Sequence, residues 1–456
     1  MIVTVNPATG ENITEHPLHT RQDVQLILDS AAQAQKAWGK KSVSERVRLL
    51  PRLAGVLRRN KAAYAALITA EMGKPIAESE AEIEKCAVTC EFYAEAALKY
   101  LDDIHVKSNA TDSRVVFDPL GVVLAIMPWN YPFWQFIRFA APALAAGNGA
   151  LLKHANNVAG CAQVLEEAFR EAGTPEGLVS TLIVNASDVA GILADDRVAA
   201  VTLTGSTEVG KIVAAQAGSL MKKQVLELGG SDPFIVLADA DVELAAKMAV
   251  KARFSNTGQS CISSKRFIVD ENIADRFVEL FVAGVEKLKT GEPTDRANQI
   301  GPMARENLRS SLHSQVERSV KEGAVLLTGG QAKEGPGYYY LPTVLDHVKP
   351  NMTAALEETF GPVAAVIRVR DEEEAIAVAN ATEFGLGAAV WTGNVENGYK
   401  IARKVEAGAV FVNGLVASDA RLPFGGIKQS GYGRELGEFG IREFTNVKTL
   451  WIGPAI

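Results

Sequence analysis

The sequence predicts an α/β protein with two doubly wound, Rossmann-like domains and a small additional β element. Three observations favour this fold class. Residues 21–106 carry apolar side chains at helical spacing. From about residue 122, short apolar runs alternate with amphipathic stretches, and a second series of the same kind follows Pro233. Such alternation is typical of βαβ units that build parallel sheets.

The strands of both domains are expected at these apolar runs. In the first series they are GVVLAIMP, GALLK, STLIV, VAAVTLTG and QVLELGG. In the second series they are FIVL, RFIVD, AVLLTG, AAVIRV, GAAVWTG and GAVFVNG, with helices over 241–256 and 272–290. We place the domain boundary at Gly229-Gly230. The first domain then comprises residues 1–107 and 121–229, and the second comprises residues 230–426.

Two further β-like segments lie outside these series, SNATDSRVVFDP at 108–119 and TNVKTLWI at 445–452. Each is compatible with an arm that pairs with a neighbouring subunit, and equally with a local hairpin. We assign residues 108–120 and 427–456 to arms, and expect a homodimer or a homotetramer.

Composition excludes several classes of partner. The chain has 47 Lys+Arg against 54 Asp+Glu, a formal net charge of −7, without any run of five like charges. Nucleic acids and anionic membranes need clustered basic residues, so neither is expected as a partner. No apolar stretch approaches the ~18 residues of a membrane span. The N-terminus shows no leader pattern, and four cysteines suit a reducing compartment, so a cytoplasmic location is expected.

Cys261 differs from the other cysteines in its surroundings. Cys86, Cys90 and Cys161 follow apolar helical patterns and are expected in the core. Cys261 lies in the polar segment SNTGQSCISSK, close to Lys265, and a nearby positive charge favours the thiolate. A nucleophile is the functional interpretation, although a lone cysteine is equally compatible with a structural role.

Two polar residues at strand ends are candidates for acting beside Cys261. Glu227 ends the strand QVLEL, and the carboxyl ends of parallel strands are where α/β sheets build their sites. Partial burial there raises a carboxyl pKa toward that of a useful base. Asn130 follows GVVLAIM between two prolines, where its amide is placed to donate to a developing oxyanion. A solvent-facing glutamate is the alternative for Glu227.

Arg138 is a single charge within the apolar stretch FWQFIRFAAPALAAG. A buried charge is costly unless it is paired, and a carboxylate would suit the guanidinium as a bidentate partner. The alternative is an arginine that extends to the surface along its aliphatic stem.

A glycine loop at Gly205–Lys211 suggests a second class of function, a P-loop nucleotide hydrolase. The segment GSTEVGK nearly matches the P-loop pattern, but Ile212 stands where a Ser or Thr would hold Mg²⁺. The six histidines form neither HxH nor HExxH, so no metal site is expected.

Taken together, these segments resemble the aldehyde dehydrogenase superfamily nearly end to end. In family order they are NPATGE, PWNYP, LLKHA, TGSTEVG, LELGG, NTGQSC, EETFGP, NATEFGL and PFGGIKQSGYGRELG, followed by a closing β arm. Each motif alone is modest, whereas the shared order is specific. The resemblance implies an aldehyde dehydrogenase-like fold whose first domain binds the cofactor, whose second is catalytic and whose arms serve oligomerisation.

The resemblance also implies the catalytic roles. Cys261 matches the nucleophile, which forms a thiohemiacetal with the aldehyde and then a thioester. Asn130, with the Cys261 backbone N–H, matches the oxyanion-stabilising group. Glu227 matches the base that activates water for hydrolysis of the thioester to a free acid.

NADP or NAD is the implied cofactor. The positions that match cofactor-binding residues, or lie beside them, are Trp129, Lys153, His154, Asn156, Gly205, Ser206, Leu228, Glu358 and Phe360. Asn156 stands where the family often has a Glu that repels a 2′-phosphate. A neutral Asn156 near Lys153 and His154 leads us to expect that NADP is tolerated.

The implied substrate is an aldehyde with a distal carboxylate, because Arg138 and Ser418 match carboxylate-binding positions of succinate-semialdehyde dehydrogenases. The bacterial-type NAD(P)-dependent enzymes of that group look most similar. Ser255 departs from the pattern, since some of these enzymes have a second Arg there. Another short-chain semialdehyde, such as glutarate semialdehyde, is the alternative substrate.

Two more departures concern accessory chemistry. Phe139 stands where many relatives have a Lys linked to a proton relay, so no relay is assigned, although Glu435 matches its acidic end. Ser263 stands where some relatives have a second Cys, so a disulfide switch at the nucleophile is not expected.

Overall fold

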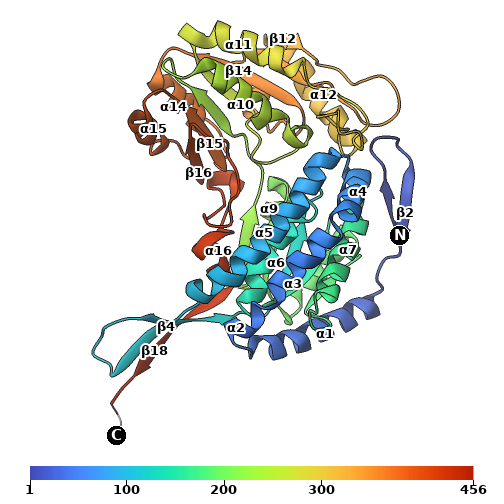
Figure 1. The fold of residues 1–456 in the computed structure, drawn as a ribbon, viewed down its shortest axis with the longest axis vertical. Helices are drawn as coiled ribbons and strands as arrows, with labels where there is room; N and C mark the ends of the chain where they lie inside the picture. Colours follow the sequence, from blue (N-terminus) through green and yellow to red (C-terminus); the bar gives the residue numbers. More distant parts are fainter. Residues whose placement is uncertain (455–456) are drawn as a thin grey trace.

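The computed structural model describes residues 1–454. Two α/β lobes, each with its own sheet, lie one above the other, and a long β arm projects from the lower lobe (Figure 1). The chain passes from the lower to the upper lobe after Glu227, and strand β10 of the upper lobe begins at Pro233.

The lower lobe surrounds a six-stranded sheet with the order β17-β9-β8-β5-β6-β7. Its parallel strands are β5 (Val122–Met127), β6 (Gly149–His154), β7 (Val179–Thr181), β8 (Val198–Thr204) and β9 (Lys223–Glu227). The short β17 (Gly431–Tyr432) runs antiparallel to β9. The first series of predicted strands is therefore confirmed, although β7 covers only the start of STLIV.

Helices cover both faces of this sheet. They are α1 (Arg21–Gly39), α2 (Val43–Arg46), α3 (Leu49–Arg59), α4 (Lys61–Met72), α5 (Ile76–Tyr100), α6 (Trp134–Ala145), α7 (Ala159–Glu171), α8 (Val189–Ala194) and α9 (Thr207–Ser219), with short 3-10 turns at Asn156–Val158 and Ala186–Asp188. Within β5, Val123 and Ala125 pack with α3 to α7, whereas Val122 and Leu124 pack with α1, α8 and α9. Successive side chains of a strand point to opposite faces of the sheet. A strand that is buried on both faces therefore has a continuous run of apolar residues in its sequence.

The upper lobe has a seven-stranded sheet with the order β12-β13-β14-β11-β10-β15-β16. The strands are β10 (Pro233–Val236), β11 (Arg266–Asp270), β12 (Val325–Thr328), β13 (Thr343–Asp346), β14 (Val363–Val369), β15 (Gly387–Trp391) and β16 (Ala409–Val412). All run parallel except β12, which is antiparallel to β13. β13 is not among the strands predicted from the sequence, and the helix expected over 272–290 ends at Val285.

The upper sheet also packs between two helical layers. The helices are α10 (Val242–Phe254), α11 (Glu271–Val285), α12 (Glu306–Lys321), α13 (Thr353–Leu356), α14 (Glu372–Asn380) and α15 (Val395–Ala402), with 3-10 turns at Ser255–Gly258 and Lys428–Ser430. One face of β10 contributes Phe234 and Val236 to the core beneath α10 and α11. The other face contributes Ile235 to the core beneath α12, α14 and α15.

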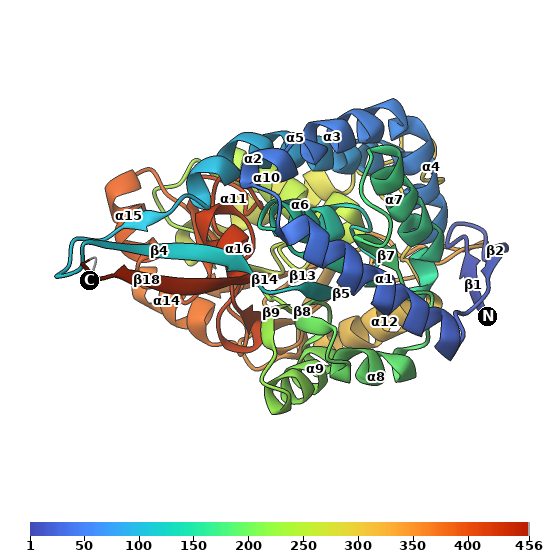
Figure 2. The same cartoon turned by 90° about the horizontal axis from the view of Figure 1, so that it is seen from below.

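The projecting arm is a three-stranded sheet of this one chain. It contains β3 (Ile104–His105), β4 (Asp112–Pro119) and β18 (Thr445–Ile452), in the order β18-β4-β3. β4 and β18 are antiparallel, and they extend together away from the lobes (Figure 2). The two predicted β segments thus pair with each other within the chain. β17 joins the lower sheet, and the helix α16 (Gly437–Glu443) leads into β18.

Several local signals explain where the elements begin. Thr20 caps α1 by accepting from the Asp23 N–H, and the Asp23 carboxylate accepts in return from the Thr20 N–H. Such a capping box satisfies two N–H groups that a helix start leaves free. The N-terminal strands β1 (Ile2–Val5) and β2 (Asn12–His16) form a separate hairpin.

The core contains three of the four cysteines. Cys86, Cys90 and Cys161 have no exposed surface, which confirms the expectation that they are core residues. Within residues 1–454, no helix combines the length and the apolarity needed to cross a membrane.

Candidate active site

The candidate residues gather where strands of the lower sheet end. β9, β8, β5 and β6 are neighbours and run parallel, so their carboxyl ends lie along one edge. Glu227 is the last residue of β9, and Lys153 is the penultimate residue of β6. Gly205 follows β8, and Asn130 follows β5. Residues far apart in sequence are therefore brought to one edge, where open α/β sheets build their sites.

Cys261 reaches this edge on a tightly constrained loop from the upper lobe. Asn256, Thr257 and Gly258 have φ values of 51°, 54° and 69°, so three consecutive residues adopt the left-handed conformation shortly before Cys261. A Cβ on Gly258 would lie 2.4 Å from the Gly361 carbonyl oxygen, so this position has no room for a side chain. Non-glycine residues persist in this conformation only where their surroundings hold them.

The side chain of Asn256 supplies part of that support. Its Nδ2 donates to the backbone oxygens of Asn130 (3.0 Å) and Gln259 (3.1 Å). Its backbone N–H donates to the Glu78 carboxylate (2.6 Å). The loop carrying Cys261 is thereby joined to the turn after β5 and to α5.

Asn130 is buried and fixed in orientation. Its Nδ2 donates to the Gln259 carbonyl at 3.0 Å, and its Oδ1 accepts from Gln135 Nε2 at 3.0 Å. Because an amide nitrogen carries two hydrogens, one remains for a ligand. Gln135 is not among the residues predicted from the sequence, since it lies about one helical turn beyond the PWNYP motif.

Lys265 ties the nucleophile loop to Glu358. Its Nζ donates to the carbonyls of Ser260 (2.9 Å) and Cys261 (2.6 Å), and lies 3.5 Å from Glu358 Oε1. Glu358 also accepts from the Gly230 N–H at 3.0 Å. A side chain at Gly230 would meet the Cys261 carbonyl oxygen at 2.7 Å, which explains the glycine there.

Cys261 is the one cysteine of the chain with exposed surface. Burial raises the pKa of its thiol to about 12, although the cations of Lys265 and Arg138 oppose the shift. The resting side chain is therefore a thiol, and its reaction as a nucleophile requires removal of a proton.

Glu227 is buried rather than solvent-facing, with 2% of its surface exposed. Burial, and next the nearby Glu435 carboxylate, raise the pKa of Glu227 to about 8. Among residues 1–454, neither Glu227 carboxylate oxygen has a hydrogen-bond partner. An unengaged carboxyl group with a pKa close to neutral has the properties of a general base.

Arg138 is buried and paired. It forms an ion pair with Glu435, its Cζ lies 4.8 Å from the centre of the Phe424 ring, and its Nη2 lies 3.5 Å from Thr204 Oγ1. The surface alternative for Arg138 is therefore wrong. The carboxylate partner that its apolar surroundings require is supplied, in this structure, by Glu435.

A charged face of α5, absent from the sequence analysis, borders the site. Glu78, Glu82 and Lys85 are spaced by four and three residues, which places them on one side of the helix. Glu82 accepts from the N–H groups of Phe133 (2.8 Å) and Trp134 (2.9 Å) at the start of α6. The sequence held no clear signal for them, because α5 also carries Glu80, Glu84, Glu91 and Glu95.

Ser418 is buried and contacts this face. Lys85 Nζ donates to Ser418 Oγ at 2.7 Å and lies 4.1 Å from the centre of the Trp134 ring. Lys85 lies on α5, Arg138 lies on α6, and Ser418 follows β16. Three separate segments therefore bring these polar groups together.

The candidate cofactor residues at the end of β6 differ in character. Lys153 Nζ donates to the His154 carbonyl (2.8 Å) and to Asn156 Oδ1 (3.0 Å). The His154 ring is buried, with Nε2 2.8 Å from the Pro132 carbonyl, and burial lowers its pKa to about 4. Burial therefore favours a neutral His154, and Lys153 is the cation that contacts Asn156.

The other candidate cofactor residues flank the same edge. Ser206 is the N-cap residue of α9. The N–H of the preceding residue, Gly205, donates to the Glu227 carbonyl oxygen. The Leu228 N–H donates to the Ser430 carbonyl, and the Leu228 side chain packs in the core of the lower lobe beside α9. Trp129 and Phe360 pack edge to face with ring centroids 5.7 Å apart.

The predicted departures have structural consequences. Phe139 packs against Phe136 and Phe444 in the core, with no polar contact for a relay. Ser255 Oγ donates to the Lys251 carbonyl at 2.9 Å, at the end of α10.

A model of the aldehyde dehydrogenase family matches residues 1–450. The chain belongs to the aldehyde dehydrogenase family. It is 49% identical to a protein named probable succinate-semialdehyde dehydrogenase [NADP(+)] from Synechocystis sp., with 99% of each chain covered. It is 47% identical to the succinate semialdehyde dehydrogenase [NAD(P)+] Sad of Escherichia coli K12, covering 98% and 97% of the two chains. A crystal structure of succinic semialdehyde dehydrogenase from Streptococcus pyogenes with NADP+ superposes with a TM-score of 0.97 at 36% identity, covering both chains fully.

Membership of the aldehyde dehydrogenase family leaves the P-loop hypothesis without support. Lys211 Nζ lies 3.5 Å from Glu208 on the surface of α9, and Ile212 is 69% exposed. The lysine is thus engaged along its own helix.

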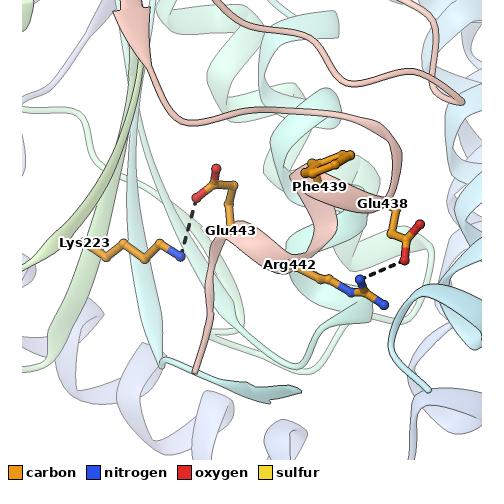
Figure 3. Close-up of a pocket in the computed structure, with 5 residues that line it drawn as sticks. All are labelled: Lys223, Glu438, Phe439, Arg442 and Glu443. Atoms are coloured by element: carbon orange, nitrogen blue, oxygen red, sulfur yellow. Dashed lines mark ion pairs between the residues drawn. The ribbon is translucent and has the colours of Figure 1, made fainter. Parts of the chain in front are cut away.

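A surface pocket of about 330 Å³ lies away from this site, at the opposite end of β9. Lys223, at the start of β9, points toward Glu443, and Arg442 pairs with Glu438 beside the exposed Phe439 (Figure 3). Glu227 is four residues further along the strand, roughly 13 Å away at strand rise. This pocket therefore belongs to α16 and the base of the arm rather than to the catalytic edge.

Proposed function

We propose that this aldehyde dehydrogenase oxidises succinate semialdehyde to succinate, with NADP+ preferred over NAD+. The observation that carries the proposal is the convergence of Cys261, Asn130 and Glu227 at one edge, beside the buried cation of Arg138. Four-carbon semialdehydes place an aldehyde and a carboxylate at the two ends of one short chain, which suits a nucleophile and a cation in one site.

The first step joins Cys261 to the substrate. The thiol proton passes to Glu227, and Sγ attacks the aldehyde carbon to form a thiohemiacetal. The free hydrogen of the Asn130 amide and the Cys261 N–H stabilise the developing oxyanion. A bound nicotinamide would supply the hydride acceptor, so that loss of hydride from the thiohemiacetal carbon would leave a thioester on Cys261.

The second step releases the acid. Glu227 first releases to solvent the proton that it took from Cys261, and it then takes a proton from a water molecule. The hydroxide adds to the thioester carbonyl, the C–S bond breaks, and Cys261 leaves as a thiolate that Glu227 reprotonates, with succinate as the product. The raised pKa of Glu227 fits it to accept and return protons near neutral pH.

The distal carboxylate is assigned to Arg138 and Ser418. Arg138 carries five N–H donors, and its pairing with Glu435 does not use them all. The guanidinium can therefore hold a second carboxylate while Glu435 keeps it oriented.

The cofactor assignment rests on the end of β6. Lys153 has a lowered pKa because it is buried, and its partners are a carbonyl and the neutral Asn156. This donor set fits a ribose that carries a 2′-phosphate, because no carboxylate opposes the phosphate there. The start of α9, at Gly205 and Ser206, is suited to the pyrophosphate.

We also propose that the protein is a homo-oligomer joined through its arm. β18 is an edge strand of the arm sheet and exposes Val447, Leu450, Trp451 and Ile452. Exposed apolar residues on an unpaired strand edge are typical of a surface that a second copy covers.

Steady-state kinetics with three aldehydes test the substrate assignment. We expect the kcat/KM of succinate semialdehyde to exceed that of butanal by about 100-fold, a difference of about 2.7 kcal/mol for one charge-assisted contact. Glutarate semialdehyde measures the tolerance for one more methylene. A higher kcat/KM with glutarate semialdehyde would replace the proposed substrate by the alternative, and equal values with butanal would contradict both.

A further inference from the structure

Lys85 is a cation of the site that the catalytic assignments leave unused. It lies on the face of α5 that Glu78 and Glu82 share, one helical turn beyond Glu82. Its Nζ donates to Ser418 Oγ at 2.7 Å and lies 4.1 Å from the centre of the buried Trp134 ring. The ammonium group is thus directed at the residue assigned to the substrate, rather than at solvent.

Lys85 has no carboxylate partner within ion-pair distance among residues 1–454. The two carboxylates that lie nearest are engaged elsewhere. Glu82 pairs with Lys74 and accepts from the start of α6. Asp419 pairs with Arg421, which lowers the Asp419 pKa to about 2.

The charges around Lys85 leave a positive excess. Arg138 is close enough to lower the Lys85 pKa, and Glu435 pairs with Arg138 alone. Burial, with Arg138 as the next cause, brings the Lys85 pKa to about 8. Of the two cations, only Arg138 has a carboxylate in ion-pair contact, and a buried cation without such a partner is stabilised by an added anion.

We propose that Lys85 binds the distal carboxylate of the substrate and, with Arg138, determines selectivity for anionic aldehydes. The inference rests on the proposed function and extends it to a residue on another element. Ser418 accepts from Lys85, so its own hydroxyl hydrogen is free to donate to the same carboxylate. The Trp134 ring holds the ammonium group in place, since a cation over an indole face is stabilised by the ring.

The test compares Lys85→Met with Lys85→Arg, using succinate semialdehyde and butanal as a matched pair with and without the carboxylate. Lys85→Met keeps the length of the side chain and removes the charge. We expect the ratio of kcat/KM for succinate semialdehyde to that for butanal to fall about tenfold or more, mainly through KM. Lys85→Arg retains the cation and should keep most of the ratio.

Lys99→Met is the matched control, because Lys99 is an exposed lysine of the same helix. It should leave the ratio within twofold. Inhibition by succinate gives a second readout that needs no turnover of the aldehyde. Its inhibition constant should rise in Lys85→Met in step with KM.

The outcomes separate the two proposals. A wild-type enzyme with no preference for succinate semialdehyde over butanal would overturn both the proposed function and the role of Lys85. A wild-type preference that survives unchanged in Lys85→Met would overturn the role of Lys85 alone. A variant that loses butanal and succinate semialdehyde turnover equally, with succinate inhibition unchanged, would assign Lys85 a structural role.

Discussion

At the scale of single residues, burial decides which groups carry chemistry. Cys261 and Glu227 both have raised pKa values because the site excludes water, so neither is ionised in most molecules at neutral pH. Of the two pKa values, that of Glu227, about 8, lies within the pH range of a kinetic assay.

The pKa of Glu227 predicts a pH profile. The base form accumulates as pH rises through about 8, so kcat for succinate semialdehyde should rise up to that pH and then level off. In Glu227→Gln, which has no carboxyl group at this position, kcat should no longer rise with pH through this range. A wild-type kcat that is flat between pH 6 and pH 9 would contradict the assignment of Glu227.

Asn156 gives a prediction about the cofactor. Asn156→Glu places a carboxylate within reach of the Lys153 ammonium, which now bonds to Asn156 Oδ1. The new charge should repel a 2′-phosphate and lower kcat/KM for NADP+ by about tenfold or more, while NAD+ is retained. Titration of both cofactors at saturating aldehyde measures the ratio, and an unchanged ratio would remove Asn156 from the site.

Sequence motifs supplied the residues that we propose to react, but not the residues that hold them in place. Cys261, Glu227 and Asn130 each lie in a recognisable segment. Gln135, Lys85 and Lys265 act through contacts with carbonyls or side chains of other segments, and their identity as partners depends on the packing of α5, α6 and the loop after α10. The neutral state of the His154 ring also depends on the fold, which buries the ring and places its Nε2 against the Pro132 carbonyl.

At the scale of elements, α5 organises the site from one side. Glu82 joins α5 to the start of α6, where it accepts two N–H groups and pairs with Lys74. A carboxylate at a helix start is favourable, and the buried Lys74 depends on it for its charge partner.

Glu82→Ala should therefore reduce the free energy of unfolding by about 3–5 kcal/mol, because it strands a buried cation. Glu95→Ala, an exposed position of the same helix, should change it by less than about 0.5 kcal/mol. Urea unfolding followed by circular dichroism measures both. Equal midpoints for the two variants would show that the Glu82 contacts contribute nothing to stability.

Element positions were largely readable from the sequence, because strands buried on both faces and amphipathic helices have distinct periods. The strand β13 (TVLD) lacked that signal, being short and bounded by polar residues. The pairing of β4 with β18 was also unreadable, since the two segments are separated by most of the chain.

At the scale of the whole molecule, the arm and the pocket at its base define a surface distinct from the catalytic edge. β18 exposes Val447 and Trp451 on one side, and α16 exposes Phe439 just before it. This apolar surface is the proposed contact with a second copy of the chain.

Trp451→Asp combined with Val447→Asp should weaken that contact and yield a smaller species. Light scattering coupled to size-exclusion chromatography measures the mass. Met221→Asp is the control, because Met221 is 93% exposed and lies on the α9–β9 turn. A wild-type protein with the mass of one chain, or a double variant of unchanged mass, would contradict the role of the arm.

In the proposed mechanism, Cys261 carries the succinyl group as a thioester that Glu227 releases. Intact-protein mass spectrometry of Glu227→Gln, quenched with acid after mixing with succinate semialdehyde and NADP+, tests it most directly. We expect a mass increase of one succinyl group, located on the peptide containing Cys261 and absent when NADP+ is omitted. An unmodified Cys261 peptide, in a variant that still binds both ligands, would contradict it.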